Sequence, residues 1–169
     1  MTEDTANRPD RLGIDARLRG EYDEAERLFQ VALDTSRVRD DQTGVGNALY
    51  NLGTLAQERG DLDGARVLYL RALEINERLG NRVGAGRTYA QLGLLAWLSN
   101  DVVGAKEAFQ HALDSGNTAA AFNLGLVLRQ RGDHSGALEA FRRAIESGDP
   151  QVTQAAKLEV SKLTGASDD

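Results

Sequence analysis

The chain has 169 residues, of which 41% are hydrophobic, and it carries a formal net charge of -6 and no cysteine. The lack of cysteine excludes disulfides, thiolate metal sites and a cysteine nucleophile. A negative net charge disfavours a large basic surface that could bind the phosphate backbone of DNA or RNA. We therefore expect no nucleic-acid partner. No apolar run is long enough to span a bilayer, and the polar start lacks the apolar core of a secretory signal. We therefore expect a cytoplasmic protein without a membrane partner.

A short motif recurs along the chain in four copies. Each copy has an alanine, an aromatic residue four positions later and a second alanine three positions after that, which is the spacing of one helix face. The copies are GEYDEAERLFQVAL (20–33), GDLDGARVLYLRAL (60–73), NDVVGAKEAFQHAL (100–113) and GDHSGALEAFRRAI (132–145). Repetition at a period of a few tens of residues is typical of stacked helical arrays.

A glycine also recurs twelve residues before the first alanine of each copy, at Gly13, Gly53, Gly93 and Gly125. Glycine inside a helix costs about 1 kcal/mol relative to alanine, so its recurrence at one position indicates a packing requirement. Glycine and alanine let two antiparallel helices approach closely, and the aromatic residue fills the space between one pair and the next. The glycines are 40, 40 and 32 residues apart, so the last repeat is shorter than the others.

In chain order, the pattern predicts helices at 8–18 and 22–38, 43–59 and 62–79, 83–98 and 101–115, and 118–131 and 134–147. These form four pairs, over about 8–40, 43–80, 83–116 and 118–148. Gly20, Gly60 and Gly132 suit left-handed helix ends, and Asp61, Asp101 and Asp133 suit N-caps of the helices that follow. A last helix over about 150–164 opens with Pro150 after Asp149 and is expected to cap the array. We expect flexible ends at 1–7 and 165–169.

These residues resemble the tetratricopeptide repeat, whose signature is W-x2-L-G-x2-Y followed by A-x3-F and a closing proline. The Leu-Gly and A-x3-F-x2-A parts match over roughly residues 9 to 149. The tryptophan slot holds other residues, namely Pro9, Leu49, Tyr89 and Ala121. The resemblance implies an all-α fold, a right-handed superhelical solenoid of about nine helices. The longer period is similar to the 40-residue variety found in polarity adaptors, kinesin light chains and peptide-sensing bacterial regulators.

Three features that could suggest chemistry have structural interpretations. The glycine clusters TGVGN (43–47) and VGAGR (83–87) lack the strand and the full motif of a phosphate loop, so we interpret them as glycines at helix starts. The only histidines, His111 and His134, are not at a paired metal-ligand spacing, and we expect them at solvent or at a contact between helices. No convergent acid, base or nucleophile set is present. We therefore expect no enzymatic activity, no cofactor and no metal.

The candidate binding residues lie on the first helix of each pair, on the side predicted to face the inside of the superhelix. Amides there can bond a peptide backbone, arginines can pair with carboxylates, and aromatic residues can act as anchors. The predicted groove residues are Arg11, Arg17, Tyr50, Asn51, Arg87, Gln91, Trp97, Phe122, Asn123 and Arg129. Ile14, Thr54, Leu94 and Leu126 lie beside them. Trp97 is assigned either to the groove or to the packed core, because its helix is very apolar.

The family resemblance adds a role for one of these positions. Asn51 and Asn123 match the backbone-clamping asparagine of peptide-binding members, and Gln91 differs from it by one methylene. The variety that holds chaperone tails uses further basic residues and amides at defined positions of its repeats. Only Asn51 and Arg87 match those positions here. The two positions in the first repeat hold Asp10 and Ile14, which do not match.

The leading hypothesis is a non-enzymatic adaptor that binds a partner peptide or helix in its concave groove. Two alternatives remain open: a small regulatory sensor of a peptide ligand, and a structural subunit that assembles with its own copies. A monomer is favoured, because the last helix closes one end of the array.

Overall fold

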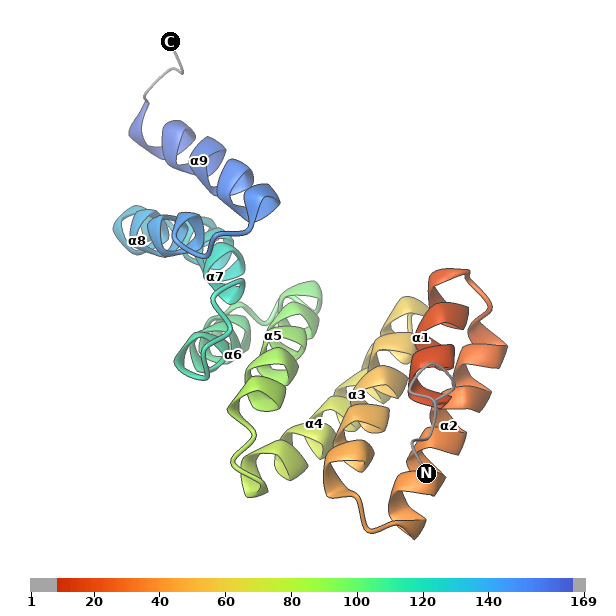
Figure 1. Ribbon diagram of the computed structural model, residues 1–169. Coiled ribbons are helices and arrows are strands. Elements are labelled where there is room, and N and C mark those ends of the chain that lie inside the picture. Colours follow the sequence, from red (N-terminus) through yellow and green to blue (C-terminus); the bar gives the residue numbers. More distant parts are fainter. Residues whose placement is uncertain (1–8, 166–169) are drawn as a thin grey trace. The chain divides into compact units, whose positions relative to one another are not determined.

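The computed structural model describes residues 9–165. The ends predicted to be flexible, 1–7 and 165–169, lie outside this range except for Gly165, which ends α9. The described chain is all helix and turn, with nine helices in the order shown in Figure 1. They are α1 (Pro9–Leu18), α2 (Tyr22–Val38), α3 (Gln42–Glu58), α4 (Leu62–Arg78), α5 (Arg82–Leu98), α6 (Val102–Asp114), α7 (Ala120–Gln130), α8 (His134–Ile145) and α9 (Pro150–Thr164). The all-α helical-repeat fold is therefore confirmed.

The glycines and aspartates that were predicted to end and begin helices lie at helix ends in the structure. Gly20, Gly60 and Gly132 have positive φ angles, which glycine adopts without the steric penalty of a Cβ. The Asp61 carboxylate accepts a hydrogen bond from the Gly64 backbone N–H at 2.9 Å, and so caps the first turn of α4. Asp101 and Asp133 cap α6 and α8 in the same way. Asp41 does so for α3, which places the glycines of the TGVGN segment in the first turns of a helix.

Two helix ends depart from this pattern. Asp40 and Asn100 adopt positive φ angles of 54° and 60°, although they carry a Cβ. They stand at helix ends of the kind that Gly20, Gly60, Gly80 and Gly132 occupy elsewhere in the chain. Aspartate and asparagine are the non-glycine residues that tolerate this conformation best.

Within each pair, the recurring glycine lies directly against the aromatic residue of the second helix. A Cβ on Gly53 would lie 2.8 Å from the Tyr69 ring, and a Cβ on Gly125 would lie 2.5 Å from the Phe141 ring. Gly13 and Gly93 have the same relation to Phe29 and Phe109. All four aromatic side chains are fully buried. The glycine–aromatic contact therefore sets the distance between the paired helices.

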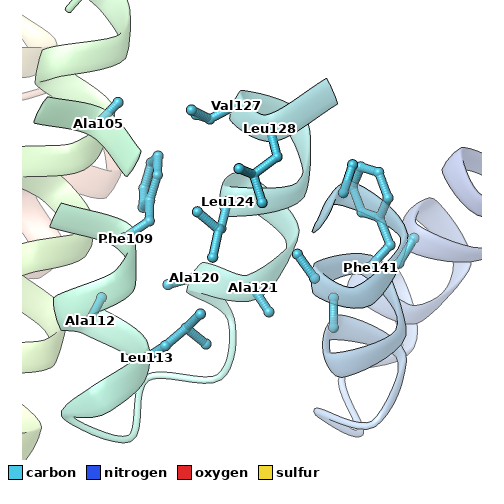
Figure 2. Packing of buried hydrophobic residues seen from close by; sticks show 14 of the residues in the cluster. Ala105, Phe109, Ala112, Leu113, Ala120, Ala121, Leu124, Val127, Leu128 and Phe141 are labelled. Carbon is cyan, nitrogen blue, oxygen red and sulfur yellow. The ribbon is translucent and has the colours of Figure 1, made fainter. Parts of the chain in front are cut away.

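The chain divides into two compact units, with the boundary inside α5 between Thr88 and Tyr89. In unit 1, buried aliphatic side chains of α2, α3 and α4 form one cluster, and Phe29 of α2 packs with Leu55 of α3 in another. In unit 2, α7 lies between α6 and α8, as Figure 2 shows. Its Leu124, Val127 and Leu128 belong to a continuous apolar cluster that includes Phe109 and Phe141.

Candidate functional site

Each unit contains five of the ten predicted groove residues. We call Arg11, Arg17, Tyr50, Asn51 and Arg87 the unit 1 face, and Gln91, Trp97, Phe122, Asn123 and Arg129 the unit 2 face. Arg11 and Arg87 are exposed, and the other eight side chains are partly buried. All ten lie on first helices of pairs, namely α1, α3, α5 and α7.

On the unit 1 face, Arg87 of α5 lies against two side chains of α3. Its guanidinium carbon is 4.2 Å from the centre of the Tyr50 ring, which is a cation–π contact. Its Nη2 donates a hydrogen bond to Asn47 Oδ1 at 3.1 Å. Asn47 and Asn51 are four residues apart on α3 and therefore share one side of that helix. The structure thus brings Tyr50 and Arg87 together, and Asn51 follows Tyr50 on α3.

The opposite end of the same side of α3 carries an ion pair with α1. Arg17 donates to the carboxylate of Glu58, at the last residue of α3. Arg17 is therefore already paired with a carboxylate of its own chain. Arg11 has no ion-pair partner in the described part of the chain, and it is exposed six residues earlier on α1.

The buried Tyr69 forms hydrogen bonds with two side chains of α3, the helix that carries Tyr50 and Asn51. Tyr69 is fully buried, and its hydroxyl lies 3.2 Å from Thr54 Oγ1 and 3.0 Å from Gln57 Oε1. Burial raises the pKa of Tyr69 to about 12, and the hydrogen bond with Thr54 opposes that rise. The Tyr50 and Tyr69 rings are 5.5 Å apart and tilted, so the buried tyrosine also positions the partly buried one.

On the unit 2 face, Trp97 is partly buried in the packed core. Its side chain packs against the apolar cluster of α6, α7 and α8, and it stays partly exposed. Its indole N–H donates a hydrogen bond to Gln130 Oε1 at 2.9 Å, which links α5 to the end of α7. Trp97 is therefore a fixed side chain that still presents part of its ring to solvent.

Two further residues of the unit 2 face are held by their neighbours. The Phe122 ring lies 5.7 Å from that of the buried Phe141. Arg129 donates to the carboxylate of Glu159 in α9, and that carboxylate also accepts from Lys162 at 2.9 Å. Glu159 is only 8% exposed, so the Arg129 guanidinium compensates a buried charge.

The three amides of the two faces differ from Arg17, Arg87 and Arg129, which each contact another side chain. Within residues 9–165, the side chains of Asn51, Gln91 and Asn123 make no hydrogen bond to the protein. No side-chain polar atom in this range is both fully buried and without a partner, so these amide groups reach solvent. Each lies two residues before the packing glycine of its repeat, above the glycine–aromatic contact. The donors and acceptors of these amides are available to a ligand.

The two histidines lie at the surface of the described chain. His111 is exposed and its ring stacks on Tyr89, with centres 4.9 Å apart, and His134 is exposed at the start of α8. The described residues contain no group of three or more histidine or acidic side chains that could hold a metal ion. None of the described helices is both long and apolar enough to cross a membrane.

A depression of about 420 Å³ lies along α2, and none of the predicted groove residues lines it. Its lining residues are Asp23, Glu26, Arg27, Gln30, Val31 and Asp34. Arg59 pairs with both Asp23 and Glu26, and Arg27 pairs with Glu24, so most of its charges are already neutralised. We do not assign a site to it.

Models of the tetratricopeptide repeat match this sequence over residues 3–78, 44–118 and 90–152. The chain is a tetratricopeptide repeat protein. Proteins of this family generally mediate protein–protein interaction. A search of the curated proteins found no match.

Two solved structures share the fold of this repeat protein. BtubC (BKLC) from P. vanneervenii has a TM-score of 0.68 and 20% identity, over 95% of this chain and 65% of that one. The chain thus spans about two thirds of the length of BtubC. The MamA protein has a TM-score of 0.64 and 22% identity, over 90% of this chain and 79% of that one. At these identities the likeness concerns the fold alone.

The intramolecular partners of the predicted residues were not foreseen from the sequence. Asn47, Glu58, Gln130 and Glu159 each contact a residue that lies 30 to 41 positions away in the chain. One signal was present: Asn47 and Arg87 are 40 residues apart, which is one full repeat, so they occupy equivalent places on neighbouring first helices.

Proposed function

We propose that this tetratricopeptide repeat protein is an adaptor that binds extended peptide segments of a partner protein on the first helices within each of its two units. The observation that supports this most strongly is the repeated amide at Asn51, Gln91 and Asn123. Each amide reaches solvent, has no partner among the described residues and lies at the same place in its repeat. An amide offers one acceptor and two donors, which matches the N–H and C=O groups of a peptide backbone.

The surroundings of the amides suit the same ligand. Tyr50 and Phe122 stand one residue before Asn51 and Asn123, and both rings are partly buried and braced by a buried aromatic ring. Such rings offer anchors for apolar side chains of the peptide. Because the rings are held in place before binding, a peptide need not immobilise them, which reduces the entropic penalty of association.

The test is a selection of peptide ligands followed by substitution of the amides. A random dodecapeptide library displayed on phage is panned against the full chain, and the selected peptides are synthesised. We expect Asn51→Ala and Asn123→Ala each to weaken binding by about fivefold, because each removes a hydrogen bond worth about 1 kcal/mol. Fluorescence anisotropy with labelled peptide measures the change.

Matched controls are available on the second helices. Gln30 and Gln110 are exposed amides that already donate to Asp34 and Asp114 within their own helices, at 3.0 Å each. Gln30→Ala and Gln110→Ala should leave peptide affinity unchanged. Equal losses in the control and test variants, or failure of the library to give any binding peptide, would refute the proposal.

A further inference from the structure

We infer that the chain forms a weak two-fold dimer through the outer side of α4, whose exposed side chains are complementary to those of a second copy. This goes beyond the proposed function, because it concerns a second helix and not the first helices that would hold a peptide. We call this surface the α4 stripe, and its exposed residues are Asp63, Arg66, Val67, Leu70, Arg71 and Glu74.

Two large apolar side chains stand at the centre of the α4 stripe. Val67 is 57% exposed and Leu70 is 50% exposed. They are three residues apart and so lie side by side on the helix. Tyr69 and the other buried residues of α4 occupy the opposite side. Removal of the exposed apolar pair from water favours association with a partner.

The charged side chains around this pair are also unsatisfied. Within residues 9–165, none of Asp63, Arg66, Arg71 and Glu74 takes part in an ion pair or a side-chain hydrogen bond. The α4 stripe therefore offers two carboxylates and two guanidinium groups to a partner.

The equivalent surface of α2 differs from the α4 stripe. Its six residues lie 40 positions earlier and line the depression described above; they are Asp23, Glu26, Arg27, Gln30, Val31 and Asp34. Arg59 pairs with both Asp23 and Glu26. Arg27 and Gln30 occupy the places of the apolar pair and bond to acidic residues of α2. The unpaired charges and the apolar pair are thus particular to α4 and do not follow from its place in a repeat.

The order of residues along the α4 stripe favours a second copy as the partner. It is the same in both directions: acidic, basic, apolar, apolar, basic, acidic. A two-fold contact joins a surface to itself, and two helices across such an axis can run antiparallel. With the axis midway between Val67 and Leu70, each Val67 lies opposite Leu70 of the second copy.

The same register brings opposite charges within reach. Arg66 lies opposite position 71 of the second copy, so Glu74 of that copy is three residues, or about 4.5 Å, further along the helix. Arg71 has the same relation to Asp63 of the second copy. A guanidinium on its long side chain can bridge this offset, so each unpaired charge gains an opposite charge across the axis.

The dimer is weak because the contact is small. Six exposed side chains on one helix lie at the low end of specific interfaces, so we expect a dissociation constant of about 100 µM. The sequence favours a monomer because the last helix closes one end of the array. The α4 stripe belongs to the second pair of helices, so a cap at α9 does not bear on it.

The experiment is sedimentation equilibrium of the full chain at concentrations from about 10 µM to 1 mM. We expect the weight-average mass to rise above the 18.3 kDa of one chain toward twice that value. Val67→Arg together with Leu70→Gln, which introduces the residues of α2 at these exposed places, should keep the chain monomeric. Leu158→Gln is the control, because Leu158 of α9 is also 50% exposed, and it should associate like the wild type.

Charge reversal tests the register. Arg66→Glu alone and Glu74→Arg alone should each weaken association about tenfold, because each places like charges within reach at both ends of the contact. An equimolar mixture of the two variants should associate more strongly than either alone, because the mixed dimer again has opposite charges at both ends.

A constant mass of 18.3 kDa up to about 1 mM would overturn the inference, and so would a mixture that associates no better than its components. The α4 variants should bind the selected peptides with wild-type affinity. A monomeric chain that still binds these peptides would therefore remove the dimer and leave the adaptor function standing.

Discussion

Substitution of Gly53 by alanine tests the glycine–aromatic contact on which the repeat packing depends. The new Cβ would lie 2.8 Å from two carbons of the Tyr69 ring, where ordinary carbon contacts need about 3.5 to 4.0 Å. Tyr69 is fully buried and its hydroxyl is hydrogen-bonded to Thr54 and Gln57, so the ring has no room to withdraw. The helices themselves must separate, or the ring must leave its rotamer.

The magnitude follows from two opposing effects. Overpacking of a buried position costs about 1 to 3 kcal/mol. Alanine in place of glycine inside a helix returns about 1 kcal/mol. We therefore expect Gly53→Ala to lower the free energy of unfolding by about 1 kcal/mol, although the same substitution in an unobstructed helix is stabilising.

Gly46 provides the matched control in the same helix. A Cβ there would meet the Cγ2 methyl of Ile75 at 3.3 Å, and this contact can relax by a shift of a few tenths of an ångström. Urea denaturation followed by circular dichroism gives the two free energies. We expect Gly53→Ala to be less stable than Gly46→Ala by about 1 to 2 kcal/mol. Equal stabilities, or a Gly53→Ala variant more stable than the wild type, would refute the packing argument.

Three further predictions concern single side chains. Because burial raises the pKa of Tyr69 to about 12, above its unfolded value near 10, its contribution to stability is complete below pH 10 and is lost as the pH rises toward 12; Tyr69→Phe should remove that part of the alkaline decline in urea denaturation curves. Arg129→Met leaves the buried Glu159 with Lys162 alone and should lower stability by about 1 to 3 kcal/mol, whereas adding Glu159→Leu should restore it, and a double variant no more stable than Arg129→Met would contradict this. Asp40→Gly removes a side chain from a left-handed helix end and should raise the melting temperature, while Gly60→Ala should lower it; a lower melting temperature for Asp40→Gly would count against the strain at that position.

The sequence predicted the helical pairs because their signals are local. Glycine, alanine and an aromatic residue recur at helical spacing, and the caps at Gly60 and Asp61 belong to the same short segment. The start of α7 was less well predicted. It begins at Ala120 rather than 118, and its cap residue Ala119 makes no side-chain hydrogen bond that would mark the boundary.

The candidate faces were predicted less completely than the helices. Helical periodicity is enough to place Tyr50, Asn51 and Arg87 on first helices, but it does not show which arginine is already paired. Arg17 meets Glu58 only when α1 packs beside α3, 41 residues later. The difference between a paired and an unpaired arginine therefore depends on packing between repeats, which a single repeat does not encode.

The most direct test of the proposed function follows side-chain amide resonances by NMR while a selected peptide is added to the full chain labelled with nitrogen-15. We expect the NH2 signals of Asn51, Gln91 and Asn123 to shift on binding. The signals of Gln30 and Gln110, which are bonded within their own helices, should stay in place. Shifts at Gln30 and Gln110 without shifts at the three repeated amides would contradict the account.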